Sequence, residues 1–132
     1  MALAIFFSGA ASASDKTDAM AVVHKWVDAF NQGDGKTGAS YCADGALVID
    51  DFAPHVWQGP GACASWYKDY SAFAEKAQIT GASVALGKTR HLDVDAGYAY
   101  LVTPATLTYT KAGKPVTDRS IVTMSLKKGD SG

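Results

Sequence analysis

Two adjacent carboxylates, Asp50 and Asp51, end a short apolar run, and the imidazole of His55 follows within a few residues. A carboxylate that contacts an imidazole orients the ring and raises its basicity, as general acid–base catalysis requires. The spacing therefore predicts a catalytic pair of Asp50 or Asp51 with His55. In the alternative interpretation, Asp51 only caps a turn before Pro54. His55 then packs on Trp57 or lies at the rim of a pocket.

Large aromatic side chains form a second group that could bind a ligand. Trp and Tyr combine an apolar body with a polar tip, so they line pockets as well as fill cores. The aromatic candidates for ligand binding are Trp26, Trp57, Trp66, Tyr70 and Tyr98. We leave both roles open for Trp57, Trp66 and Tyr98, and we expect Phe30 and Phe73 to be core residues.

Arg119 is a candidate of a different kind, because it lies in a segment of mostly apolar and hydroxyl residues. If its side chain points inward, the buried charge needs a carboxylate partner, with Asp50 or Asp118 as candidates. If it points outward, which we favour, Arg119 is a surface residue or a dimer contact.

A metal site would combine Asp50 and His55 with His91 or His24. Two imidazoles and a carboxylate suit iron or zinc, but the chain has no tight motif such as His-x-His. Neither a metal nor a cofactor is therefore expected.

Hydrophobic periodicity predicts the elements that position these residues. Apolar side chains at three- and four-residue steps indicate a helix over 15–32, a short helix over 36–42 and a third helix starting after Gly59-Pro60-Gly61. Strands are expected over 46–50, 55–58, 79–92, 97–110 and 115–127. Pro104, inside one long strand, predicts a bulge or bend there. Helices followed by an antiparallel meander indicate an α+β domain.

Composition narrows the functional classes. The 132 residues are 48% hydrophobic with a formal net charge of -1, which fits a single globular domain. No basic patch alternates with aromatic residues, so nucleic acid is not an expected partner. No apolar run reaches the length of a membrane span.

The first residues resemble the end of an export signal. An apolar stretch over 3–7 precedes Ala11-Ser12-Ala13, which has the small-x-small pattern of a cleavage site. Residues 1–13 are therefore read as the remnant of an export signal, and the protein as periplasmic or secreted. The alternative is a cytoplasmic protein with an ordinary N-terminal extension.

Cys42 and Cys63 are the only cysteines. Export would permit them to pair, whereas in a cytosolic protein they would be small buried side chains. Because two cysteines give no framework pattern, unpaired thiols are the favoured prediction.

The order of elements resembles the SnoaL-like, nuclear transport factor 2-like superfamily. The likeness rests on the segments HKWVDAFNQGD, YCADGALVIDDFAPHVWQGP and ACASWYKDY, which cover 24–34, 41–60 and 62–70. It implies a cystatin-like α+β cone with helices packed in a curved antiparallel sheet, a pocket at the open end and dimers through the sheet face. It also implies one more strand after KKGDSG, so the domain at 14–132 would lack the last family strand.

Ketosteroid isomerase belongs to the same superfamily and provides a direct comparison of site residues. The resemblance places Asp50 at the position of its catalytic base. Trp26 falls where that enzyme has a tyrosine donor, and Val122 falls near its late-strand aspartic acid. Because an indole is the weaker donor and valine cannot donate at all, isomerase chemistry by this route is not expected.

The function that these residues support best is binding of a small, largely apolar molecule in the cone pocket. Asp50, His55, Trp57 and Tyr98 would be its polar and aromatic contacts. One alternative is an acid–base enzyme of the isomerase, hydrolase or cyclase type that uses Asp50, His55 or both. Another is a non-catalytic domain for dimerisation or interaction, with contacts on the sheet face.

Overall fold

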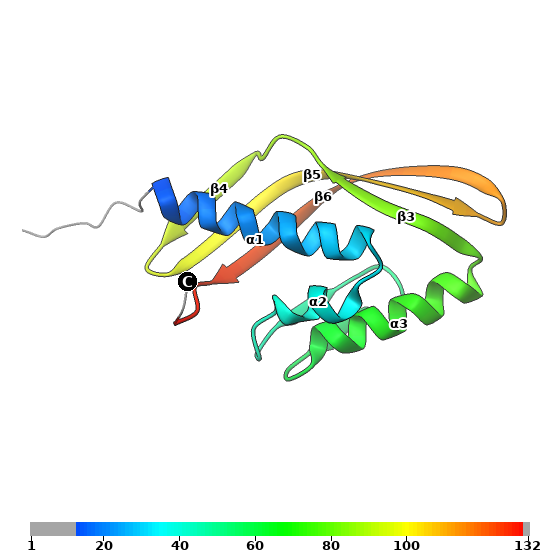
Figure 1. The fold of residues 1–132 in the computed structure, drawn as a ribbon, viewed down its shortest axis with the longest axis horizontal. Helices are drawn as coiled ribbons and strands as arrows, with labels where there is room; N and C mark the ends of the chain where they lie inside the picture. The colour runs from blue at the N-terminus through cyan, green and yellow to red at the C-terminus, as the bar shows by residue number, and fades with distance from the viewer. Residues whose placement is uncertain (1–12, 131–132) are drawn as a thin grey trace, which may run out of the picture.

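The computed structural model describes residues 13–130 and has the predicted α+β architecture (Figure 1). The helices are α1 (Ala13–Asn31), α2 (Gly35–Ser40) and α3 (Ala62–Lys76). The strands are β1 (Leu47–Ile49), β2 (Val56–Gln58), β3 (Ile79–Leu86), β4 (His91–Asp95), β5 (Tyr98–Lys111) and β6 (Lys114–Lys127). The predicted export signal at 1–13 lies almost wholly outside the described residues and stays a prediction.

The central strand of the main sheet is β5. It pairs antiparallel with β6 along its whole length on one edge, while β3 and β4 share the other edge end to end. The prediction of one continuous strand over 79–92 is therefore wrong. Gly87 donates its N–H to the carbonyl of Pro104 at 2.8 Å. Because proline has no backbone N–H, it cannot donate a hydrogen bond back to this segment, and β3 ends there.

Pro104 does not produce the predicted bulge. The β5–β6 register runs through the Pro104–Ile121 pair without a shift. The irregularity lies instead in the β3–β5 pairing, between Thr80 and Ser83.

The two faces of the sheet differ in burial. We call the face covered by α1 the inner face and the opposite one the outer face (Figure 1). On β5, the side chains of Ala99, Leu101, Thr103 and Ala105 alternate inward and are buried. Val23 and Val27 of α1 are buried as well. The core therefore forms where the inward-facing alternate residues of β5 pack against the apolar face of α1.

A smaller layer contains α2, α3 and the β1–β2 hairpin, and a disulfide joins the end of α2 to the start of α3. Cys42 and Cys63 are bonded, with Cα atoms 6.4 Å apart, so the prediction of unpaired thiols is wrong. The proximity arises from helix packing: Gly38 lies against the ring of Tyr67, where a Cβ would overlap the phenol. Such packing leaves no spacing pattern in the sequence.

Two polar contacts connect distant parts of the chain. The side-chain amide of Asn31 donates to the carbonyl of Val84 at 2.9 Å and accepts from its N–H at 2.7 Å, which fixes the end of α1 to β3. Lys128 forms an ion pair with Asp15 at 3.0 Å.

Within residues 13–130, no strand pairs with the free edge of β6. No helix in this part of the chain is long and apolar enough to cross a membrane.

Candidate functional site

Asp50 follows the last residue of β1, and two donors hold its carboxylate. The indole N–H of Trp66, on α3, donates to Oδ2 at 2.9 Å, and the backbone N–H of Asp51 donates to Oδ1 at 2.7 Å. The loop behind it is closed by a bond from the Asp50 N–H to the carbonyl of His55 at 3.0 Å. The carboxylate therefore has a defined orientation.

Aromatic rings surround Trp66. The ring centroids of Trp26 and Phe30, on α1, lie 6.0 Å and 6.1 Å from that of Trp66. The ring of Tyr70 stacks on Trp66 with a centroid distance of 5.6 Å. We call these four residues the aromatic cluster. Trp26, Phe30 and Tyr70 are only partly buried, so the cluster keeps apolar surface that a ligand could cover.

Burial raises the pKa of Asp50 above its ordinary value, and the carboxyl group of Asp51 raises it further, while the bonds from the Asp51 N–H and the Trp66 indole partly offset the shift. No cationic side chain is among the main causes of this shift. Burial also raises the pKa of Tyr70, with smaller contributions from the negative charges of Asp50 and Tyr109. The carboxyl group therefore keeps its proton to a higher pH than a solvated one.

The sequence interpretation missed a phenol–carboxylate pair on the inner face of the sheet. Tyr109 donates to Asp118 Oδ2 at 2.9 Å, and this bond raises the pKa of Tyr109. The charge of Asp51 adds to that shift, so the pair lies near the loop after β1. The signal was available, since Tyr109 is in phase with the inward-facing Leu101, and Asp118 pairs with Leu107.

The predicted pairing of His55 with a carboxylate is not seen among the described residues. The ring Nδ1 lies 3.2 Å from the backbone carbonyl of Asp50, and the side chain is exposed. Trp57 is 5% exposed, packs on Phe52 and donates its indole N–H to Asp69 Oδ2 at 2.8 Å. It therefore lies in the core behind the aromatic cluster.

Two predicted ligand-binding residues, Tyr98 and Arg119, lie on the outer face of the sheet. Tyr98 is 59% exposed, and Arg119 is opposite Thr106 in the β5–β6 register. The sheet separates both side chains from Asp50. They cannot share one pocket with the aromatic cluster.

Two hollows in the described part of the chain lie away from Asp50. One, of about 260 Å³, lies on the outer face between Arg90 and Arg119. The other, of about 460 Å³, lies between Met20 of α1 and Leu92 of β4. In residues 13–130 no group of three or more His, Cys, Asp or Glu side chains is placed to hold a metal ion.

Comparison with known proteins identifies the domain. A model of the SnoaL-like domain family matches residues 19–132. No curated protein sequence matches the chain significantly.

Solved structures share the fold at low sequence identity. A structure from Catenulispora acidiphila in complex with S-DNPA is 12% identical, with a TM-score of 0.73 over 92% of this chain and 87% of that one. A ketosteroid isomerase-like protein from Erwinia carotovora atroseptica is 16% identical, with a TM-score of 0.66 over 92% and 89%. A nuclear transport factor 2-like protein with a cystatin-like fold from Novosphingobium aromaticivorans is 13% identical, with a TM-score of 0.69 over 90% and 76%.

Proposed function

Since this chain belongs to the SnoaL-like domain family, we propose that it binds a small, largely apolar molecule on the aromatic cluster beside Asp50. One observation carries the proposal: a half-buried carboxylate, fixed by the indole of Trp66, borders partly exposed aromatic rings. Such a combination of apolar surface and one oriented polar group is typical of ligand sites. The S-DNPA complex of one structural neighbour supports small-molecule binding in general.

The chemistry of Asp50 defines the ligand more closely. Each carboxylate oxygen has already accepted one hydrogen bond and retains a free lone pair. A ligand N–H or O–H group would donate to Asp50 while its ring or hydrocarbon body covers Trp26 and Tyr70. With Asp51 and Asp118 nearby, the site favours neutral or cationic molecules over anions.

A binding screen tests this proposal. Small aromatic and alicyclic amines, alcohols and acids are screened by thermal shift, because a ligand that binds only the folded state raises the melting temperature. For each hit, Asp50→Asn should weaken binding about tenfold or more. Tyr98→Phe, on the outer face, is the matched control and should bind as the wild type does. Equal affinities for wild type and Asp50→Asn would refute the role of Asp50.

The second candidate function is acid–base catalysis. The raised pKa of Asp50 supports it, since a general acid or base works best when it titrates near the working pH. We propose Asp50 as the proton-exchanging group, while His55 could contribute only after a movement of the 51–55 loop. NMR titration of the Asp50 carboxyl carbon is the test. An ordinary value for Asp50 would exclude this function and leave the binding proposal intact.

We also propose that two copies associate through the outer face of the sheet. The side chains of Tyr98 and Tyr100 are exposed there, and Asp95, Tyr98 and Lys127 follow one another in a row across three strands. A two-fold axis along the strands would bring Asp95 of each copy over Lys127 of the other. Tyrosines with flanking opposite charges are typical of interfaces.

Charge reversal tests this association. Asp95→Lys and Lys127→Asp should each weaken the dimer, because each variant faces like charges across the interface. The double variant restores opposite charges and should restore the dimer. A monomeric wild type in light scattering, or a double variant no better than the singles, would contradict the proposal.

The disulfide supports export to an oxidising compartment. We accordingly propose a periplasmic or secreted protein. Thiol counting on protein recovered from its native host is the test, and two reactive thiols in the fresh extract would favour the cytoplasm.

A further inference from the structure

Two arginines on the outer face have no partner within the described residues. Arg90 and Arg119 are exposed, and both ion pairs found in residues 13–130 involve other side chains. Neither guanidinium takes part in a side-chain hydrogen bond with a described residue. A guanidinium presents five N–H donors in a planar fork that fits a carboxylate or a phosphate.

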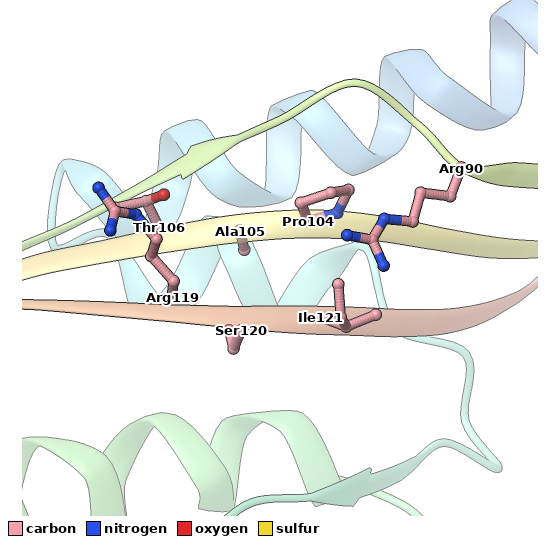
Figure 2. A pocket seen from close by; sticks show the side chains of 7 residues that line it. All are labelled: Arg90, Pro104, Ala105, Thr106, Arg119, Ser120 and Ile121. Atoms are coloured by element: carbon pink, nitrogen blue, oxygen red, sulfur yellow. The ribbon is translucent and has the colours of Figure 1, made fainter.

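Strands β5 and β6 and the segment before β4 bring the two arginines to the same hollow (Figure 2). Arg90 precedes β4 and is anchored by its N–H to the carbonyl of Val102 at 2.9 Å. Arg119 lies on β6, opposite Thr106 of β5. Figure 2 shows the guanidinium of Arg119 beside Thr106 at one end of the hollow, and that of Arg90 above Ile121 at the other.

No carboxylate of the described chain is placed to neutralise the pair. Asp118, next to Arg119 in sequence, points to the inner face, where it accepts the bond from Tyr109. Asp93 lies on the outer face of β4, but its Oδ2 is 3.9 Å from His91 Nε2. Two guanidinium groups on one hollow repel each other unless an anion is present.

We propose that the hollow between Arg90 and Arg119 binds the carboxylate or phosphate group of a small organic anion. Its volume of about 260 Å³ is below the range of about 300–1,000 Å³ for drug-sized ligands, which limits the occupant to a small molecule or the head of a larger one. The hydroxyl of Thr106 adds a donor. Ile121 and Pro104 supply apolar contacts to the carbon atoms next to the charge.

This site is independent of the one proposed at Asp50. The two lie on opposite faces of the sheet and carry opposite charges, so they select different ligands. An anion that binds between the arginines does not require that the aromatic cluster bind anything.

NMR titration at constant ionic strength tests the proposal, with inorganic phosphate and butyrate as separate probes. The Nε–H signals of Arg90 and Arg119 and the amide signals of Thr106 and Ile121 should shift saturably. Arg90→Gln and Arg119→Gln should each weaken binding about tenfold or more. Lys114→Gln, at the hairpin end of β6, removes the same charge outside the hollow and should change affinity less than about twofold.

The outcomes separate the sources of the anion and the rival explanations. Tighter binding of phosphate indicates a phosphate ester as the ligand, and tighter binding of butyrate indicates a carboxylic acid. Absence of saturation, or an equal loss in Lys114→Gln, would show non-specific attraction and overturn the proposal. So would light scattering that shows a wild-type dimer dissociated by either glutamine variant, because the arginines would then serve a contact between copies. Melting temperatures check that every variant is folded.

Discussion

The two faces of the β5–β6 ribbon show how one strand can carry two unrelated surfaces. Leu101 on the inner face is 0% exposed, whereas its neighbour Tyr100 on the outer face is 46% exposed. The inner side carries carboxylates and aromatic rings around Asp50, while the outer side carries unpaired arginines. Strand alternation therefore decides which residues can share a site, and closeness in sequence does not.

Truncation of neighbouring side chains should show the largest difference between the faces. Leu101→Ala removes a fully buried side chain and should lower the free energy of unfolding by about 3 kcal/mol. Tyr100→Ala, one residue away on the outer face, should cost less than about 1 kcal/mol. Urea unfolding measures both. Similar losses would mean that the outer face is covered, as in the proposed dimer.

Removal of the disulfide should weaken the helical side of the molecule. The bond closes a loop between residues 21 apart in sequence, so Cys42→Ala with Cys63→Ala should cost about 3 kcal/mol. Calorimetry on the double variant and on reduced wild type should give similar melting temperatures. If reduction leaves the melting temperature unchanged, the disulfide contributes no stability to the helical side.

Asp50→Asn should change how stability depends on pH. Because the folded-state pKa of Asp50 lies above its unfolded value, its contribution to stability is full below the ordinary pKa and is lost as pH rises through the folded value. The variant lacks this pH-dependent loss, so the wild type should lose stability relative to Asp50→Asn as pH rises from 4 to 7, by at most about 1 kcal/mol. Asp95→Asn on the outer face provides the baseline. A wild type that gains stability over Asp50→Asn between pH 4 and 7 would contradict the shift.

Tyr67→Phe should have the smallest effect. The hydroxyl of Tyr67 is buried without a hydrogen-bond partner in the described chain, so its removal should be neutral or stabilise by up to about 1 kcal/mol. Burial, and then the charge of Asp34, raise the pKa of Tyr67 to about 12. Wild type should therefore lose stability relative to Tyr67→Phe as pH rises from 10 through 12. A destabilised variant at pH 7 would reveal a hidden partner, such as a bound water.

Local pattern was enough to predict most of the fold. The periodicity of Val23, Val27 and Phe30 predicted α1, and the strands expected over 97–110 and 115–127 correspond to β5 and β6. The failures depend on contacts between distant segments. The break between β3 and β4 follows from Pro104 on the neighbouring strand, and the disulfide follows from the packing of α2 on α3.

The candidate site was predictable in part for the same reason. Asp50, Trp26, Trp66 and Tyr70, all candidates from the sequence, do come together. Tyr98 was named as a contact of that pocket although its parity places it on the other face, whereas Arg119 points outward as the sequence favoured. The bond of His55 to a backbone carbonyl was not predictable, because it depends on how the 51–55 loop closes.

Asn31 has a consequence for how the protein could misassemble. Its side-chain amide offers β3 one donor and one acceptor at Val84, as a neighbouring strand would, and so obstructs that border of the sheet against intruding chains. The opposite border, along β6, has no such guard within residues 13–130. Fibrous aggregation would accordingly start from the edge of β6. A charged or proline substitution on β6 should therefore reduce aggregation at high protein concentration more than one elsewhere.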